Sequence, residues 1–344
     1  MAHEFDAALP WVILAALTDP VALTLAHDLA RAIALLRRAA HKKAIEPPIL
    51  DALKEQGENA LILLNAAATD DYERDGFSWR VGESRIELFA DSNRGLCKGL
   101  FDLLMNIGFQ WKGIHTEVVP KPHHAAVYRL ASVSNYCSSG SRSMQRLLIQ
   151  REMSAAKQEK LLKWASRNNV DTVIFPLQVR SSALISTAKN YAFSIEQGGW
   201  ELSRLLPRRY FLLDRSLFRM AYGKRDRWHN FCPTNPNTIK IIRKESQRLF
   251  QLFPEILVYH IWPDRGYEQQ WCSCPTCRAF TPAEQNRIAC DAVADVLQRI
   301  KPRASLSYYE QNTERNDIAL RPNLFRIETL PEQAQSEPWI LFYR

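Results

Sequence analysis

Three acidic residues stand just after apolar runs that are typical of strands. Asp264, Glu310 and Glu328 each lie within two residues of the end of such a run. A barrel enzyme gathers its reacting groups at the carboxyl ends of its strands, because the βα loops build that face. Hydrolysis of a glycosidic bond needs two carboxyl groups, one to protonate the leaving oxygen and one to act as nucleophile or to activate water. The spacing therefore allows an acid/base pair.

Asp264 is our choice for the acid, and Glu310 is our choice for its partner. Trp262 and Tyr259 come shortly before Asp264 and would form the apolar wall that raises a carboxyl pKa. The alternative is that the acids form ion pairs with arginines and only hold loops, and for Glu328 we favour this alternative. The arginines available for such pairs are Arg265, Arg321 and Arg326.

Aromatic residues near these acids could stack on sugar rings. Tyr308 and Tyr309 come directly before Glu310. Successive residues of a strand point to opposite faces, so one of the two tyrosines must point away from the site. We expect Tyr308 and Trp262 to contact the substrate.

The segment 195–200 reads Ile-Glu-Gln-Gly-Gly-Trp and follows another predicted strand. We expect Glu196 and Trp200 to contact the substrate there, because Gly198 and Gly199 let the backbone approach a ligand and an indole can form a platform. An ordinary glycine turn explains the same residues without a ligand. Both interpretations stay open.

Cys272, Cys274 and Cys277 form a Cys-x-Cys-x-x-Cys motif, which is tight enough for three thiolates to converge on zinc. A structural zinc site usually has four ligands, so a fourth would come from elsewhere in the chain. The candidates are Cys232, Cys290 and His260. Alternatively, the cysteines only pack together or are redox-labile thiols. If zinc binds, we expect it to hold the loop after Asp264 rather than to catalyse.

The segment 204–227 is rich in arginine and contains Asp214 and Asp226 as its only acids. Arginine presents a fork of donors that matches a carboxylate or sulfate, so this run could recognise an anionic sugar. A solvated surface is the commoner role of a charge run, and we favour it here. His229 follows the run and is a candidate polar contact to the substrate, with a surface histidine as the alternative.

About 120 residues at the N-terminal end of the chain alternate strand and helix patterns. The expected strands are 11–17, 60–64, 77–81 and 85–89, the last two forming a hairpin, and the expected helices are 21–40, begun by Asp19 and Pro20, and 93–107, ended by Gly108. These elements predict a small α/β layer.

The alternation resumes after 120–124, Pro-Lys-Pro-His-His, which is the expected linker. The expected strands are 127–134, 172–177, 191–195, 256–262, 305–309 and 324–327, and the expected helices are 158–167, 239–253 and 283–300. Strands joined by such helices pair in parallel, and six or seven of them predict a (β/α) barrel of the TIM type, with an open doubly wound sheet as the alternative.

The predicted fold class is therefore α/β, with an N-terminal α/β domain at 1–122 and a barrel domain at 123–344. The segment 339–342 could add a seventh strand, and no residues remain for an eighth. We therefore expect a barrel that is incomplete at the C-terminus.

Two parts of the sequence resemble known proteins. The segment 92–111, followed by Val118-Val119-Pro120, resembles the N-terminal domain of family 67 alpha-glucuronidases, and similar domains precede the barrels of family 20 hexosaminidases. The barrel of a broad, largely uncharacterised group of bacterial proteins with such an N-terminal domain is similar to 223–236, 262–266 and 271–277.

This resemblance covers most of the chain from Trp11 to about Leu330. It implies a glycoside hydrolase that acts on a poly- or oligosaccharide by carboxylate acid/base catalysis. We expect no required cofactor, and the cysteine motif leaves a structural zinc open. Where the group usually has Gly-Gly-His, this chain has Trp200 after its two glycines. That departure and the short C-terminus favour the alternative, a non-catalytic carbohydrate-binding or scaffold protein with a degenerate barrel.

The composition excludes several other classes of protein. The 344 residues are 46% hydrophobic and 24% charged, as in soluble globular proteins of two domains. The net charge of +8 permits an anionic carbohydrate, but the chain has no Walker loop, dinucleotide motif or zinc-finger pair, so no nucleotide cofactor or nucleic-acid partner is expected. The longest apolar run, 11–17, is too short to span a membrane. No signal peptide is visible, so we expect a cytoplasmic protein with reduced thiols.

Overall fold

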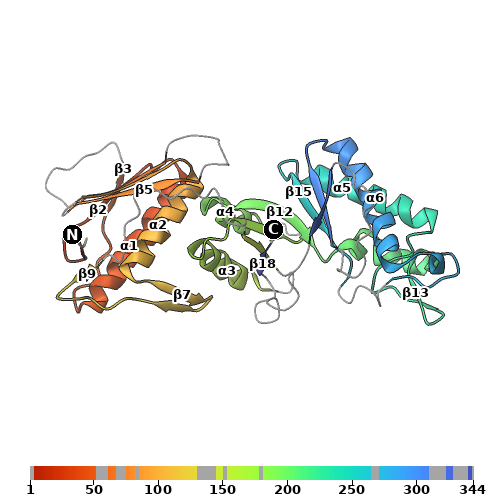
Figure 1. The fold of residues 1–344 in the computed structure, drawn as a ribbon, viewed down its shortest axis with the longest axis horizontal. Helices are drawn as coiled ribbons and strands as arrows, with labels where there is room; N and C mark the ends of the chain where they lie inside the picture. Colours follow the sequence, from red (N-terminus) through yellow and green to blue (C-terminus); the bar gives the residue numbers. More distant parts are fainter. Residues whose placement is uncertain are drawn as a thin grey trace. The chain divides into compact units, whose positions relative to one another are not determined.

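The structure, a computed structural model, describes residues 4–51, 61–66, 75–82, 85–129, 145–149, 153–177, 181–264, 271–309, 323–327 and 340–342 (Figure 1). The chain divides into two compact units. The first comprises Met1–Met144, Met153–Asp171 and Ser181–Ser194, and the second comprises Gln145–Glu152, Thr172–Arg180 and Ile195–Arg344. Both units are discontinuous, whereas we expected one division between residues 122 and 123.

The first unit is built on a five-stranded sheet with the order β3-β2-β4-β6-β5. β2 (Val12–Ala15) pairs in parallel with β3 (Ile49–Asp51) and β4 (Leu61–Ala66), and β4 pairs in parallel with β6 (Arg85–Ala90). β5 (Phe77–Val81) and β6 form the predicted antiparallel hairpin. The strand β3 was not predicted, because three residues after a Pro-Pro pair carry too little pattern.

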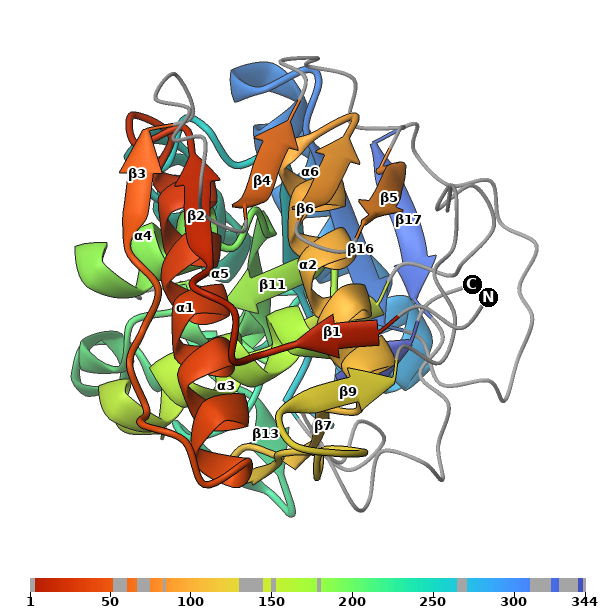
Figure 2. The same cartoon turned by 90° about the vertical axis from the view of Figure 1, so that its left-hand side faces the viewer.

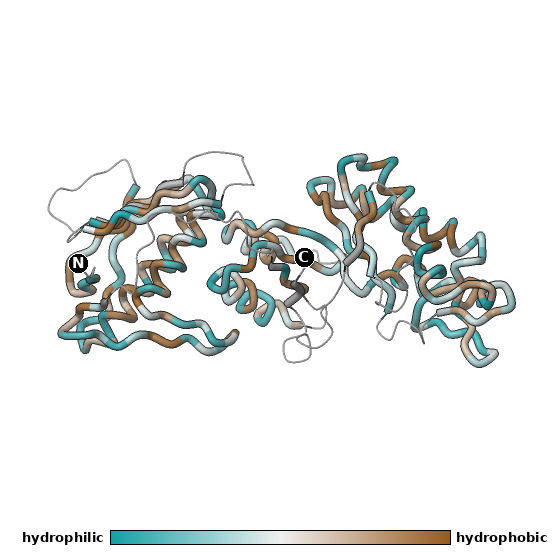
Figure 3. Tube along the Cα trace, viewed as in Figure 1, coloured by the Kyte–Doolittle hydropathy of each residue, from teal (hydrophilic) through white to brown (hydrophobic). Residues whose placement is uncertain are grey.

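Two helices cover one face of this sheet, as Figures 1 and 2 show. α1 (Pro20–Ala39) begins where the Asp19 side chain accepts a hydrogen bond from the N–H of Val21, at 2.8 Å. α2 (Asn93–Ile107) ends at Gly108, whose φ of 114° is readily adopted only by glycine. Apolar and polar residues alternate along both helices (Figure 3), so each buries one side against the sheet. The predictions for both helices are confirmed.

Two smaller pairs of strands complete the N-terminal part. β7 (Gln110–Gly113) and β8 (Thr116–Val118) form a hairpin, and β1 (Glu4–Asp6) pairs antiparallel with β9 (Val127–Arg129). We predicted the region 127–134 as a strand of the barrel. That placement is wrong for β9, which pairs within the first unit; the remainder of this prediction lies outside the described residues.

Two helices from later in the chain also belong to the first unit. They are α3 (Ala155–Arg167) and α4 (Ser182–Asn190). The Trp164 indole of α3 donates to the carbonyl of Trp111 at 3.1 Å, and the hydroxyl of Tyr191, directly after α4, donates to Asp28 at 2.8 Å. These contacts explain why the compact units do not follow the order of the sequence.

The second unit contains a seven-stranded sheet with the order β17-β16-β15-β12-β11-β10-β18. Its strands are β10 (Gln145–Leu148), β11 (Thr172–Phe175), β12 (Ser194–Gly199), β15 (Val258–Ile261), β16 (Ser305–Tyr309), β17 (Leu324–Ile327) and β18 (Ile340–Phe342). The pairings β10–β11, β12–β15, β15–β16 and β16–β17 are parallel. This sheet confirms the α/β class and the parallel arrangement.

The two edges of this sheet are β17 and β18, and within the described residues they do not pair with each other. β18 runs antiparallel to β10. The segment 339–342 was predicted as a seventh strand, and β18 confirms a strand there. It lies at the edge opposite β17 and is antiparallel, whereas the next strand of a (β/α) barrel would follow β17 in parallel.

Helices α5 (Pro236–Leu252) and α6 (Pro282–Ile300) pack together in the second unit (Figure 1). α6 begins with a capping box, in which the Thr281 hydroxyl accepts from the N–H of Glu284 and the Glu284 carboxylate accepts from the N–H of Thr281. The segment between β12 and α5 holds three short 3-10 helices, Leu202–Leu205, Arg208–Leu212 and Arg215–Leu217, and the hairpin of β13 (Met220–Ala221) and β14 (Lys224–Arg225). None of the helices in the described part of the chain is long and apolar enough to cross a membrane.

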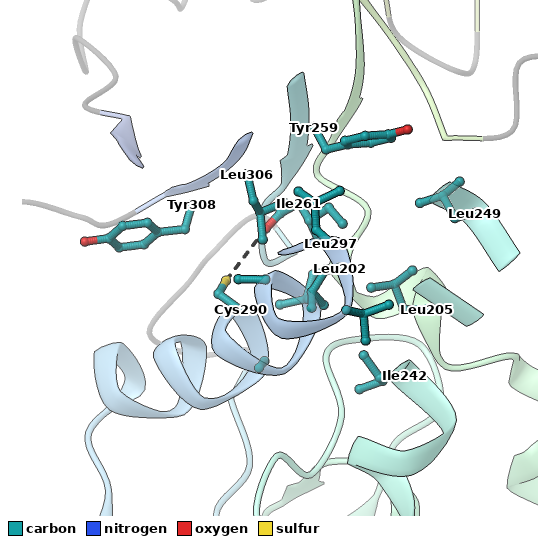
Figure 4. Packing of buried hydrophobic residues seen from close by; sticks show 14 of the residues in the cluster. Leu202, Leu205, Ile242, Leu249, Tyr259, Ile261, Cys290, Leu297, Leu306 and Tyr308 are labelled. Atoms are coloured by element: carbon teal, nitrogen blue, oxygen red, sulfur yellow. Dashed lines mark hydrogen bonds between the residues drawn. The ribbon is translucent and has the colours of Figure 1, made fainter. Parts of the chain in front are cut away.

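Alternate residues of the strands face opposite sides of the second sheet. Tyr259, Ile261, Leu306 and Tyr308 belong to the main core cluster, which also contains residues of α5 and α6 such as Leu297 (Figure 4). The residues between them, which include His260 and Ser307, therefore face the other side of the sheet. We call that side the interior face.

Gly198 lets β12 and β15 approach closely. A Cβ atom at Gly198 would lie 1.8 Å from the carbonyl oxygen of His260, and φ there is +129°. Gly223 also has a positive φ, +75°, but a Cβ there would meet no atom within 4 Å. We expect Gly198→Ala to lower the free energy of unfolding by about 3 kcal/mol or more, and Gly223→Ala by about 1 kcal/mol. Urea unfolding would measure both, and equal losses would contradict the role of close strand approach.

Candidate active site

A network of hydrogen-bonded, buried polar side chains lies on the interior face of the second sheet. Arg146 on β10 donates from Nε to Glu196 Oε2 at 3.0 Å, and Glu196 lies 2.6 Å from Nε2 of His260. His260 Nδ1 lies 2.6 Å from the Ser307 hydroxyl, which also accepts from the Trp262 indole at 3.0 Å. His260 and Ser307 are fully buried. The strands β10, β12, β15 and β16 thus contribute side chains to one network.

The protonation of this network follows from its geometry. Burial alone would raise the pKa of Glu196, but His260 and Arg146 lower it below its usual value. Burial lowers the pKa of His260, so we assign a neutral ring. The Trp262 N–H occupies one side of the Ser307 oxygen, which leaves the Ser307 proton for His260 Nδ1 and makes Nε2–H the donor to Glu196. Each of these polar hydrogens then has an acceptor.

Glu196 was predicted to contact the substrate at the end of a strand. The strand β12 instead continues through Gly199, so Glu196 lies within it. Both of its carboxylate oxygens are bound by Arg146, at 3.0 and 3.3 Å. The two glycines are part of a paired strand and not an ordinary turn, because β12 pairs with β15 at both positions. The structure therefore gives Glu196 a place in the interior network.

An aromatic cluster lies at the carboxyl ends of β12, β15 and β16. The ring of Trp200 lies 5.2 Å from that of Trp262 and 4.9 Å from that of Tyr309, both edge to face. Trp262 is fully buried, whereas Trp200 and Tyr309 are partly exposed. Trp200 and Trp262 were both predicted to contact the substrate. Of these two, Trp200 has exposed surface that a ligand could contact, whereas Trp262 is fully buried.

Tyr308 requires a correction. It was predicted to contact the substrate, but it is 3% exposed and lies in the core cluster on the helix side of the sheet (Figure 4). Tyr309 faces Trp200 instead. Successive residues of β16 point to opposite faces, so only one of Tyr308 and Tyr309 can face the site. The sequence did not show which of the two it is.

Asp264 lies just beyond β15 and is held by residues of the segment that follows β12. Its Oδ1 accepts from the Ser203 hydroxyl at 2.9 Å, and its N–H donates to the Asn230 side chain at 3.2 Å. Arg208 donates to the same Ser203 oxygen at 3.1 Å. Asp264 Oδ2 is buried and has no hydrogen-bond partner among the described residues. Burial raises the pKa of Asp264, while the Ser203 hydrogen bond and the Arg208 charge oppose this.

Glu310, the predicted partner of Asp264, lies outside the described residues, and so does the third acid, Glu328. Arg265 and Arg321 are outside them too. His229 is described, and its ring nitrogen Nδ1 contacts the Asp226 carboxylate and Arg219 Nη2. These contacts lower the pKa of Asp226 to about 2 against the opposing effect of burial. His229 is thus held by Asp226 through Nδ1, while its side chain remains 38% exposed.

Much of the arginine-rich segment is bound within the protein. Arg204 pairs with Glu201 at 3.2 Å, and Arg219 pairs with Asp226 at 2.9 Å. Arg208 donates to the carbonyls of Trp228 and His229. Arg225 donates to the carbonyls of Ser216 and Phe218. These guanidinium groups hold the segment together, a role that the sequence did not reveal.

The cysteine motif has a fourth member in space. The Sγ atoms of Cys232, Cys272, Cys274 and Cys277 all lie within 4.8 Å of one another. The other two candidates for a fourth ligand are engaged elsewhere, since His260 belongs to the interior network and Cys290 contacts Ile261 and Asn286. The sequence left three choices open, and the geometry selects Cys232.

Comparison with known proteins identifies the fold. No protein-family model and no curated protein matches the sequence. Among solved structures, the Vibrio harveyi GH20 exo-β-N-acetylglucosaminidase in complex with N-acetylglucosamine matches 97% of this chain and 56% of its own, with a TM-score of 0.53 and 14% identity. The Flavobacterium johnsoniae chitobiase matches 90% of this chain and 50% of its own, with a TM-score of 0.55 and 15% identity.

A third match is the Bacteroides fragilis β-N-acetylhexosaminidase, with 12% identity, a TM-score of 0.53, and coverage of 95% of this chain and 67% of that one. The chain spans about half the length of the first three matching structures. It therefore has the α/β fold of GH20 glycosidases. The expected family 67 character of the N-terminal part is not confirmed by these matches.

Sequence reasoning missed most of the residues around Asp264. Ser203 and Asn230 come from a segment without regular pattern, so no sequence signal marked them. Arg208 was noted only as one member of the arginine-rich segment. Arg146 and Ser307 had a usable signal, since each is a polar residue inside an apolar strand pattern.

The raised pKa of Asp264 makes a prediction about stability. The folded chain holds this proton more tightly than the unfolded chain, so ionisation of Asp264 costs stability as the pH rises from 3.8 through the raised value. We expect Asp264→Asn to be at least as stable as the wild type at neutral pH and to lose that advantage toward pH 3.8. Thermal unfolding across this pH range would test it.

Asp291→Asn is the matched control, because Asp291 forms an i,i+4 ion pair with Arg287 on α6. This variant should not gain stability at neutral pH. A loss of stability in Asp264→Asn with an unchanged pH profile would show that burial does not dominate at Asp264.

Proposed function

We propose that this protein is a glycoside hydrolase that cleaves an oligosaccharide with Asp264 as its general acid. The observation that carries the proposal is a buried carboxyl group with a raised pKa just beyond a strand end, in a fold shared with GH20 glycosidases. The carboxyl ends of parallel strands are where α/β folds bind their ligands. A general acid has to be protonated when the substrate binds, and burial shifts the pKa of Asp264 in that direction.

The surroundings of Asp264 suit an acid that gives up its proton. Oδ1 already accepts a hydrogen bond from Ser203, so the proton belongs on Oδ2, which has no partner among the described residues. Transfer from Oδ2 to the leaving oxygen would create a carboxylate. Ser203 and the positive charge of Arg208 would then stabilise it, since both lower the pKa of Asp264.

Most glycosidases use a second carboxyl group, and we propose Glu310 for this role. Glu310 follows Tyr309, whose ring contacts Trp200, and β16 is the neighbour of β15 in the sheet. If Asp264 and Glu310 are the two reacting groups, a carboxyl separation of about 5–5.5 Å would indicate a retaining enzyme, and about 6.5–9.5 Å an inverting one.

The proposed substrate is a carbohydrate that stacks on Trp200. Two matching structures, from Vibrio harveyi and Streptomyces plicatus, contain N-acetylglucosamine. Several arginines of the 204–227 segment are bound by carbonyls and carboxylates, which argues against assigning them to an anionic sugar. β-N-Acetylglucosaminides are therefore the first substrates to test, and uronides the second.

A second candidate function is carbohydrate binding without hydrolysis. Its support is the pairing of the other carboxyl groups: Glu196, Glu201 and Asp226 are each bound by an arginine. Within the described part of this unit, these groups are not available as the second catalytic carboxyl. Calorimetric binding of chitooligosaccharides without any turnover would establish this function instead.

Loss of the acid should abolish most of the activity. We expect wild-type protein to hydrolyse a 4-methylumbelliferyl glycoside, and Asp264→Asn to lower kcat by about 10²–10⁴-fold with little change in KM. The decline of wild-type kcat at high pH should also be absent from the variant, because it reports loss of the Asp264 proton. Asp291→Asn should behave as wild type. Unchanged kcat in Asp264→Asn would sink the assignment.

Removal of the proposed sugar platform should weaken binding. We expect Trp200→Ala to raise KM about tenfold, equivalent to about 1.4 kcal/mol, with a smaller effect on kcat. Trp200→Phe keeps an aromatic face and should retain most of the affinity. Melting temperatures of both variants would separate loss of stacking from loss of packing against Trp262. Equal KM values for all three proteins would exclude Trp200 from the binding site.

A further inference from the structure

We propose that Cys232, Cys272, Cys274 and Cys277 bind one structural zinc ion through four thiolates. Cys232 lies 3.7 Å from Cys274 and 3.6 Å from Cys277, measured between Sγ atoms. Tetrahedral zinc with Zn–S bonds of about 2.3 Å places its sulfur atoms about 3.8 Å apart. A disulfide requires about 2.05 Å, and all four thiols are free. The spacing of the four sulfurs therefore fits a shared metal ion.

The surroundings of the cluster favour metal binding over simple packing. Among the described residues, the one partly buried apolar side chain packed against these buried thiols is Met220. The other contacts are polar. The N–H of Met220 lies 3.2 Å from Cys272 Sγ, and the Thr234 hydroxyl lies 3.0 Å from Cys277 Sγ. Hydrogen-bond donors of this kind stabilise thiolate ligands.

A positive group also stands beside the cluster. Arg225 Nη1 lies 3.9 Å from Cys272 Sγ and is fixed by the carbonyl of Phe218 at 2.6 Å. Zinc with four thiolates carries a net negative charge, because each thiol releases its proton to solvent on binding. The guanidinium of Arg225 would partly neutralise that charge.

The loop that carries three of the ligands is held in place by one buried side chain. Gln285 on α6 accepts from the N–H of Cys272 and donates to the carbonyls of Cys272, Cys277 and Phe280. It is 3% exposed. The three sulfurs are thus presented by a backbone whose hydrogen bonds are already made, which reduces the cost of ordering the loop around a metal.

The proposed metal would connect two distant segments close to Asp264. Cys232 and Cys274 are 42 residues apart in the chain. Asn230, two residues before Cys232, accepts the backbone N–H of Asp264. Zinc at this place would therefore hold the loop that carries Asn230 and would not touch the substrate. This inference does not depend on the proposed hydrolase activity.

The first experiment uses the full-length wild-type protein, purified with a reductant and without chelators. We expect elemental analysis to find about one zinc per chain. X-ray absorption at the zinc edge should show four sulfur ligands at about 2.3 Å. Three sulfurs and one nitrogen would remove Cys232 from the set. Iron in place of zinc, or a protein that holds no metal and takes up neither zinc nor cobalt after reduction, would overturn the proposal.

Variants provide the matched comparison. Cys232→Ser and Cys272→Ser should lose most of the bound zinc and the intense visible bands of a tetrahedral cobalt–thiolate site. Cys97→Ala, a buried cysteine of the first unit, should keep both. Unchanged zinc content in both serine variants would exclude these cysteines as ligands. If a variant does not fold, the sulfur count of the wild type still decides the question.

Discussion

A buried carboxylate has to be compensated by charge and hydrogen bonds, and the interior face of the second unit is arranged around this requirement at Glu196. Arg146 supplies the charge and His260 the remaining donor, from strands on either side of β12 in the sheet order. Removing one partner from such a set is far more costly than the net gain from forming it. The register of β10, β12 and β15 is therefore constrained, because it has to bring Arg146 and His260 within hydrogen-bond distance of Glu196.

The same alternation that builds this network determines which residues reach the candidate site. His260 of β15 and Trp262, directly after this strand, share a face, and so do Ser307 and Tyr309 of β16. The network lies on the strands themselves, and the aromatic cluster of Trp200, Trp262 and Tyr309 lies at their carboxyl ends. Tyr308 is excluded from the cluster by its position one residue away, and it stabilises the helix-side core instead.

Much of the fold was predictable because its elements carry local signals. Asp19 with Pro20, and Gly108, mark helix ends through backbone groups within a few residues, and the structure confirms them. β12 was misjudged because two glycines are read as a turn, whereas here they permit close pairing with β15. β9 was misplaced, and the partner of β18 was not predicted, because three-residue strands take their partners from distant parts of the chain. The hydrophobic pattern of a segment predicts that it forms a strand, but it does not predict with which strand it pairs.

The candidate site was predictable only in its central residue. Asp264 stood out because it follows an apolar strand, but its proton affinity is set by residues that sequence spacing could not bring together. Ser203 and Arg208 favour the carboxylate, and burial favours the acid. Because all three effects come from the fixed positions of neighbouring segments, a shift of the segment that carries Ser203, Arg208 and Asn230 would change the charge of Asp264. The contacts that anchor this segment, which include those of Arg225, are for this reason part of what sets the pKa of Asp264.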